Sequence, residues 1–224
     1  MGMSETTTIM VMAKECLPGR VKTRLHPPLT LADAARVAAA SLADTLDAAE
    51  ASGLPVVVCA QGDVPVRAGM RSIPQVDGGL DERIAAAVEE CAGRVLLIGM
   101  DTPQVDPLLL RSFAEEWPDD IDGWFGPADD GGFWLLGLDD LSPCRLGGRS
   151  RGDLVRGVPM SSVETGARQR ERLADAWLRV TDAPPLTDID DIESLRAVSD
   201  SLPRGGHLAT LLVELGIDRR GGAS

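Results

Sequence analysis

The chain has 224 residues, of which 44% are hydrophobic and 25% are charged, so it can bury the core of one fairly large domain. Its formal net charge of −13 argues against a broad surface for nucleic acid or an anionic membrane, although a local pocket could still hold phosphate. No apolar run approaches the roughly 20 residues that a membrane helix needs.

Apolar runs and capping residues predict strands that alternate with helices. The strands are expected at 8–13, 54–60, 94–100, 121–125, 133–138 and 176–181. The helices are expected between Thr30 and Gly53, at 80–92, 107–117 and 161–175, and twice more before the C-terminus. This alternation predicts an α/β fold with a mostly parallel sheet covered on both faces. One domain is expected over 1–224, with flexible tails at 1–7 and 219–224.

Several local signals support these boundaries. Thr30 with Asp33 resembles a capping box, and Asp106 followed by Pro107 is a strong helix start. Ser161 with Glu164 forms a second possible capping box. The glycine- and arginine-rich segment 147–157 is expected to be a mobile loop.

The four cysteines favour a reducing compartment. They lie far apart in the sequence, with no Cys-x-x-Cys pair and no cluster with histidine: Cys16, Cys59, Cys91 and Cys144. A zinc site or a disulfide framework is therefore not expected, and a cytoplasmic location is.

A cation-rich segment follows the first strand. Residues 14–24, called the basic loop below, carry Lys14, Arg20, Lys22 and Arg24. A turn at Gly19 would let backbone amides approach a ligand, and Arg and Lys are suited to phosphate oxygens. In a parallel sheet, ligands bind at the carboxyl ends of strands, where this loop starts. The pattern favours phosphate binding over a merely solvated loop.

Three later segments carry carboxylates that could bind a ligand. Asp101 comes directly after the strand at 94–100, where it could bind Mg²⁺ or Mn²⁺ or simply form a turn. Asp130 precedes Gly131 and Gly132, which could border a ligand or form an ordinary hairpin turn. The acidic run 188–191 could be a metal site, a helix N-terminus, or both.

These segments, in this order, resemble a known family. The most specific parts of the resemblance are residues 18–25 and 126–132. Gln75 and the segment 81–83 also match the family pattern. The chain resembles the bacterial DUF2064 group, often called glycosyltransferase family A, over about residues 9–195. That group is similar to the guanylyltransferases of molybdopterin and coenzyme F420 synthesis. The resemblance implies the GT-A nucleotide-diphospho-sugar transferase fold, a three-layer α/β/α arrangement around a mostly parallel sheet.

The resemblance also implies roles for individual residues. Lys22, Arg24 and Asp101 are the expected catalytic residues, and the metal ligands are expected among Asp101, Asp188 and Asp190. The expected nucleotide- or substrate-binding residues are Lys14, Gly19, Arg20, Thr23, Gln75, Thr102, Asp130, Gly131 and Gly132.

The sequence departs from the family pattern in three places. Cys16 stands where proline is usual, and Asp191 stands where threonine is common. Met160-Ser161-Ser162 replaces a usual Trp-Ser-Thr, which puts the acceptor contacts there in doubt.

Two reactions fit these residues. The cation-rich loop with a single carboxylate at the central strand favours nucleotidyl transfer, while the family label favours glycosyl transfer. The expected ligands are a nucleoside triphosphate or nucleotide sugar, a small-molecule acceptor, and Mg²⁺ or Mn²⁺; no nucleic acid is expected, and the oligomeric state is left open. The alternative is a non-catalytic, nucleotide-binding regulatory protein.

Overall fold

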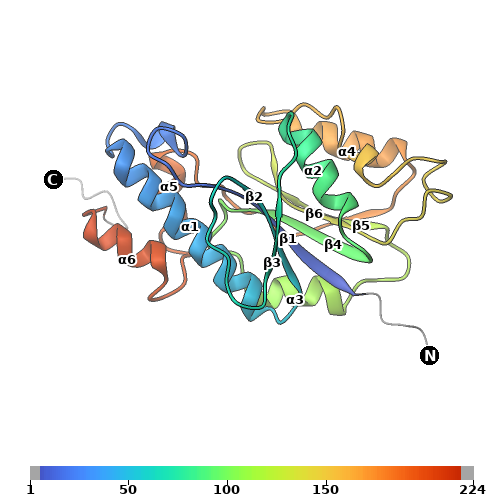
Figure 1. The fold of residues 1–224 in the computed structure, drawn as a ribbon, viewed down its shortest axis with the longest axis horizontal. Coiled ribbons are helices and arrows are strands. Elements are labelled where there is room, and N and C mark those ends of the chain that lie inside the picture. The colour runs from blue at the N-terminus through green and yellow to red at the C-terminus, as the bar shows by residue number, and fades with distance from the viewer. Residues whose placement is uncertain (1–5, 218–224) are drawn as a thin grey trace.

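A seven-stranded mixed sheet forms the centre of the computed structural model, which describes residues 6–217 (Figure 1). Its strands lie in the order β3-β2-β1-β4-β6-β5-β7. In chain order they are β1 (Thr7–Lys14), β2 (Val56–Gln61), β3 (Arg71–Pro74), β4 (Arg94–Gly99), β5 (Gly123–Pro127), β6 (Phe133–Leu138) and β7 (Val180–Asp182).

Only one strand of this sheet runs against the others. β1 pairs in parallel with β2 and β4, β2 with β3, and β5 with β7. β6 is antiparallel to both β4 and β5, because a short turn joins it directly to β5. The expectation of a mostly parallel sheet is confirmed.

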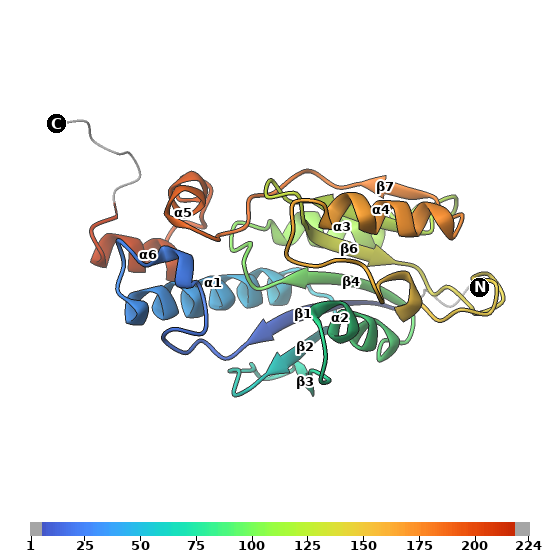
Figure 2. The same cartoon turned by 90° about the horizontal axis from the view of Figure 1, so that it is seen from above.

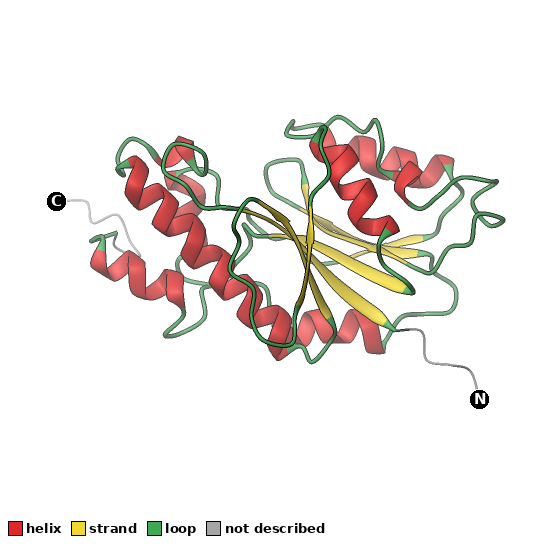
Figure 3. Ribbon diagram, in the orientation of Figure 1, coloured by secondary structure: helices red, strands yellow, loops and turns green. Residues whose placement is uncertain are grey.

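Helices cover both faces of the sheet (Figures 2 and 3). They are α1 (Leu31–Ala51), α2 (Leu80–Glu89), α3 (Pro107–Glu115), α4 (Thr165–Asp175), α5 (Ile192–Val198) and α6 (His207–Glu214), with short 3-10 helices η1 (Thr23–Leu25) and η2 (Gly152–Leu154).

The alternation of side chains along β1 separates the two apolar layers. Ile9 and Val11 pack in one core with residues of α1 and α3, whereas Met10 and Met12 pack in a second core with residues of α2 and α4. A third apolar cluster joins the far side of α1 to η1, α5 and α6. The expected three-layer α/β/α arrangement is therefore confirmed, with α5 and α6 added behind α1.

The expected helix starts at α1 and α3 are confirmed. The Thr30 hydroxyl accepts a hydrogen bond from the Asp33 amide at 3.0 Å, and the Asp106 carboxylate accepts one from the Leu108 amide at 2.8 Å. The predicted box at Ser161 is wrong. α4 begins only at Thr165, whose hydroxyl accepts from the Ser162 amide at 3.1 Å.

Other predictions need correction. β3 was not predicted, because it is short, lies at the edge of the sheet and is mostly exposed. β7 is shorter than 176–181, since Trp177 has a positive φ of 56° and ends the preceding turn. The segment 147–157 includes η2, and Arg151 there donates to the carbonyls of Cys91 and Gly93. This segment is thus anchored at Arg151.

The predicted tails fall mainly beyond the described residues. Residues 1–5 and 218–224 lie outside them, while Thr7 is buried and begins β1.

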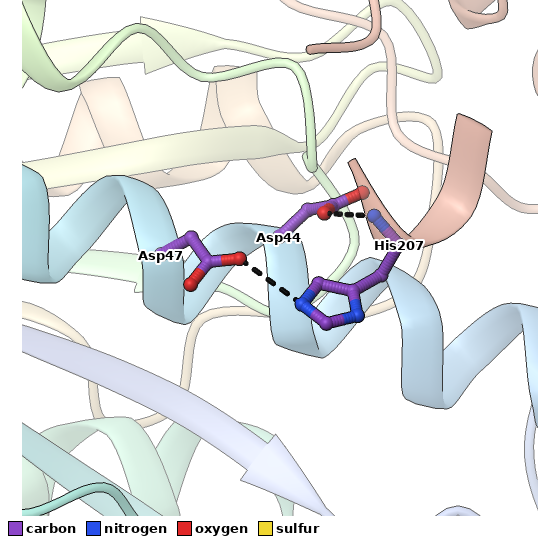
Figure 4. Close-up of side chains that lie close together, drawn as sticks. All are labelled: Asp44, Asp47 and His207. Carbon is purple, nitrogen blue, oxygen red and sulfur yellow. Dashed lines mark hydrogen bonds and ion pairs between the residues drawn. The ribbon is translucent and has the colours of Figure 1, made fainter. Parts of the chain in front are cut away.

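A buried carboxylate ties α6 to α1. Asp44 of α1 is 2% exposed and accepts a hydrogen bond from the backbone amide of His207 at 2.7 Å (Figure 4). It accepts a second from the backbone amide of Leu208 at 2.9 Å. Gly206 precedes α6 and has no side chain to cap it, so Asp44 supplies the cap from another helix. Asp47, one turn further along α1, pairs with the His207 ring at 3.2 Å.

Removing this cap should cost more than removing its exposed neighbour. We expect Asp44→Ala to lower the free energy of unfolding by roughly 1–3 kcal/mol, because two buried amides lose their acceptor. Asp47→Ala should cost less than about 1 kcal/mol, as exposed ion pairs usually do. Urea unfolding measures both, and equal losses would contradict the capping role.

Candidate functional site

The sheet topology brings distant segments to one edge. β1 and β4 are parallel neighbours, so Lys14 and the residues after Gly99 emerge together. β5 ends and the antiparallel β6 begins at this same edge, since Ile98 of β4 pairs with Leu135 near the start of β6. The turn at 128–132 therefore reaches the same region as the basic loop.

Lys22 lies at the centre of this edge. Its ammonium contacts Asp101 Oδ1 at 2.7 Å and Asp190 Oδ1 at 3.5 Å, and it also donates to the carbonyl of Ile189. The side chain is only 7% exposed. The three partners of Lys22 come from two segments far from it in sequence, so only the tertiary fold can create this arrangement.

The backbone around Lys22 is held by packing. Lys22 itself has φ 47° and ψ 38°, a left-handed conformation that is uncommon for a residue with a side chain. η1 follows at once, and its Leu25 is fully buried in the cluster behind α1. Burial of Leu25 thus anchors the end of the basic loop and directs Lys22 inward.

A small cavity of about 130 Å³ opens beside this cation. It is lined by Lys14, Val21, Lys22, Thr23, Arg24, Ala38, Met100, Asp101 and Asp190. Arg24 is 71% exposed and lies 3.4 Å from Asp190 Oδ2. The cavity therefore combines three cationic side chains with two carboxylates.

The acidic run 188–191 divides into two roles. Asp191 caps α5 through a capping box with Ser194, whereas Asp190 meets Lys22 and Arg24. The Ile189 amide donates to the Asp101 carbonyl at 3.0 Å, which holds the run against the end of β4. The interpretation of this run as a helix N-terminus is therefore confirmed for Asp191, and the metal site stays a prediction.

Asp188 lies close enough to the other carboxylates to feel their charge. Burial, and then repulsion from Asp101 and Asp130, raise the pKa of Asp188 from its ordinary 3.8 to about 8. Asp130 therefore lies near the acidic residues, although it does not line the cavity.

The glycines after Asp130 allow another part of the chain to pack closely against this turn. Gly131 has φ 89°, and a Cβ there would lie 2.3 Å from the carbonyl oxygen of Val163. The Gly166 amide donates to the Gly131 carbonyl at 2.8 Å, and the Gly132 amide donates to Asp130 Oδ1 at 2.7 Å. The turn is thus packed against Val163 and the start of α4, which fill the space that the glycines create.

Other predicted residues are spread around the edge. Gln75 donates from its amide to the carbonyls of Ala13 and Cys59, at 2.9 Å each. It lines a second cavity, of about 390 Å³, at the ends of β2 and β3. Gly19 and Arg20 are exposed in the basic loop but do not line the 130 Å³ cavity. Thr102 is 1% exposed, so its side chain faces the interior.

Sequence reasoning missed two parts of the site. The Ile189 carbonyl is a backbone acceptor, and the identity of an apolar residue gives no signal for it. The second cavity is lined by residues of β3 and by Arg83, which donates to the Gln61 side chain at 2.9 Å. Because β3 was not predicted, this cavity was not expected.

Cys16 adds no charge to the site. It is half-buried within the basic loop, and burial, followed by the nearby Asp101, raises its pKa to about 11. At neutral pH it remains a thiol, so it is a weak nucleophile.

Among residues 6–217, two groups of residues have the donors for a metal ion. The acidic cluster of Asp101, Asp188 and Asp190 offers carboxylate oxygens, the donors that Mg²⁺ and Mn²⁺ prefer. Ligand atoms of Asp44, Asp47 and His207 lie within 4.8 Å of one another and could also share an ion. However, Asp44 already caps α6 with both oxygens, which fits a structural role better.

Solved structures define the class of this fold. A candidate nucleotide-diphospho-sugar transferase from Desulfovibrio desulfuricans G20 has a TM-score of 0.78 and 23% identity, over 94% of this chain and 95% of that one. Rv0371c from Mycobacterium tuberculosis H37Rv, in complex with manganese, has a TM-score of 0.53 and 18% identity, over 88% and 100%. A nucleotidyl transferase from Methanothermobacter has a TM-score of 0.53 and 18% identity, over 91% and 98%.

The chain therefore has the fold of the nucleotide-diphospho-sugar transferases. Residues 34–162 match the DUF2064 family, described as an uncharacterized protein conserved in bacteria, and the chain belongs to this family. No curated protein matches the sequence significantly. Within residues 6–217, no helix is both long enough and apolar enough to cross a membrane.

The raised pKa of Asp188 predicts a pH-dependent stability. Between its ordinary pKa of 3.8 and about 8, the unfolded chain loses this proton while the folded protein keeps it, so stability falls as pH rises through that range. Asp188→Asn removes this penalty. In metal-free buffer, the Tm of Asp188→Asn relative to the unmodified protein should rise from pH 5 to about pH 8 and then level off.

Asp119→Asn is the matched control, since Asp119 is exposed and the substitution makes the same change of side chain. A Tm difference for Asp188→Asn that stays constant from pH 5 to pH 8 would contradict the proposed burial and repulsion.

Proposed function

We propose that the protein is a metal-dependent transferase that moves a nucleotidyl or glycosyl group from a nucleotide donor to a small-molecule acceptor. The observation that carries this proposal is the meeting of Lys22, Asp101 and Asp190 at the carboxyl edge of the sheet. Ligands of open α/β sheets bind at this edge. The shared fold with a candidate nucleotide-diphospho-sugar transferase and with a nucleotidyl transferase supports it.

The cationic side chains are suited to the donor's phosphates. Lys14, Lys22 and Arg24 line one cavity, and Arg24 is exposed enough to turn toward a ligand. A guanidinium can grip phosphate oxygens with two parallel hydrogen bonds, while each ammonium adds a compact charge. We assign these three residues to the phosphates, with Gly19, Arg20 and Thr23 completing the basic loop around them.

The carboxylates are suited to a divalent ion. Asp101 would hold Mg²⁺ or Mn²⁺, with Asp188 or Asp190 as a second ligand; the manganese in Rv0371c supports such an ion in a protein of this fold. A bound ion would supply positive charge to the phosphate oxygens as the reaction proceeds. Lys22 and Arg24 add to that charge, and the rigid edge of the sheet holds the reacting groups in place.

The donor's base and sugar would lie in the neighbouring cavity. The 390 Å³ cavity at the ends of β2 and β3 lies beside β1, and Gln75 lines it while its amide also bonds the end of β1. A nucleotide could therefore extend from this cavity to the basic loop. On the other side, Asp130, Gly131 and Gly132 would border the donor or the acceptor.

A ligand screen should come first. Thermal shift with Mg²⁺ and a panel of nucleoside triphosphates and nucleotide sugars should reveal a donor, because a ligand at about 100 times its Kd adds about 2.7 kcal/mol of stability. With that donor, released pyrophosphate indicates nucleotidyl transfer, whereas released nucleoside diphosphate indicates glycosyl transfer. Binding with no turnover for any acceptor tried would favour the non-catalytic alternative.

Two substitutions separate the metal role from the phosphate role. Asp101→Asn keeps the size of the side chain and removes its charge, so nucleotide binding should lose its Mg²⁺ dependence and kcat should fall roughly 100-fold or more. Arg24→Gln should weaken binding of the same nucleotide with or without Mg²⁺. Isothermal titration of both variants measures this, and unchanged Mg²⁺-dependent binding in Asp101→Asn would return Asp101 to the role of a turn residue.

A further inference from the structure

The ammonium of Lys22 lies among oxygen atoms that suit a metal ion. It contacts one oxygen of Asp101 at 2.7 Å and one of Asp190 at 3.5 Å, and it donates to the Ile189 carbonyl. Two carboxylate oxygens and a backbone carbonyl are also typical ligands of hard divalent cations. With its side chain 7% exposed, Lys22 is much less accessible than Arg24, at 71%.

A divalent ion and this ammonium cannot share these oxygens. An ion of the Mg²⁺ type binds oxygen at about 2.1 Å, so a metal between Asp101 and Asp190 would stand where the Lys22 ammonium now lies. Two cations at such close range also repel each other strongly in a partly buried site. Metal binding to these carboxylates therefore requires Lys22 to move away.

The surroundings of Lys22 allow such a movement. The cavity beside it is open to Thr23 and Arg24 in the basic loop, where phosphates would bind. The left-handed backbone of Lys22 is intrinsically unfavourable, so its contacts with Asp101 and Asp190 help to keep the present conformation. A phosphate group in the cavity would offer the ammonium an alternative anionic partner.

We propose that Lys22 is a built-in counter-ion that occupies the metal position of the free protein and leaves it when metal and phosphate arrive together. This inference rests on the proposed function, because it uses the same carboxylates as metal ligands. It also predicts that metal binding depends on the presence of the donor. The free protein holds divalent metal weakly, and the donor's phosphates favour metal binding by drawing Lys22 away.

The test measures metal affinity in the absence of nucleotide. Mn²⁺ binding is followed by the electron paramagnetic resonance signal of the free ion. Lys22→Met should bind Mn²⁺ at least about tenfold more tightly than the unmodified protein, within the usual range of coupling between sites. Without metal, Lys22→Met should have a lower Tm, since the carboxylates lose their partner, and Mn²⁺ should raise that Tm more than it raises the Tm of the unmodified protein.

Lys14→Met is the matched control. Lys14 lines the same cavity and its loss removes the same charge, but the residue does not occupy the oxygens of Asp101 and Asp190. Its Mn²⁺ affinity should rise much less than that of Lys22→Met. Adding Asp101→Asn to Lys22→Met should abolish the gain, which places the extra ion at this site. Lys22→Gln, whose amide can still bond a carboxylate, serves if Lys22→Met does not fold.

The outcomes separate this inference from the proposed function. Equal Mn²⁺ affinities for Lys22→Met, Lys14→Met and the unmodified protein would overturn the counter-ion role, while metal-dependent nucleotide binding could still stand. Similar gains in Lys22→Met and Lys14→Met would also overturn it, because they would reflect only net charge. An absence of Mn²⁺ binding in every variant, with and without nucleotide, would overturn both proposals.

Discussion

The ion pair between Lys22 and Asp101 is the interaction on which the candidate site depends. It joins the basic loop after β1 to the end of β4, and through Asp190 it includes a third segment near the C-terminus. A protein with a net charge of −13 has little general attraction for phosphate. The proposed affinity for phosphate must therefore come from cations concentrated at this one edge. Salt screens the repulsion from acidic residues more than about 8 Å away, so the nearby cations decide whether phosphate binds.

The apolar cluster behind α1 determines where these charges lie. Leu25 from η1 and Ile189 beside Asp190 are both fully buried in it. The Ile189 amide also bonds the Asp101 carbonyl, so the late acidic segment is held by packing and by hydrogen bonding. In this fold α5 and α6 matter to the site because they complete the cluster against which Leu25 and Ile189 pack, and Asp44 fixes α6 to α1.

Much of this arrangement could be predicted from local sequence signals. The apolar runs of β1 and β4 and the Asp106-Pro107 helix start are strong patterns, and parallel strands place Lys14 and Asp101 at one edge. β3 escaped prediction because an exposed edge strand has little apolar periodicity. The packing role of Gly131 could not be predicted for a different reason: the tertiary fold brings its close neighbour, Val163, to it. Likewise, composition cannot assign Asp191 to a helix cap and Asp190 to an ion pair.

We propose that metal and nucleotide meet at Asp101. Locating Mn²⁺ by anomalous scattering, in crystals grown with Mn²⁺ and the donor found by thermal shift, tests this most directly. We expect a manganese peak on the Asp101 carboxylate, shared with Asp188 or Asp190, with the donor's phosphates facing Lys14 and Arg24. Manganese found only at Asp44, Asp47 and His207, or a nucleotide bound away from the basic loop, would contradict this proposal.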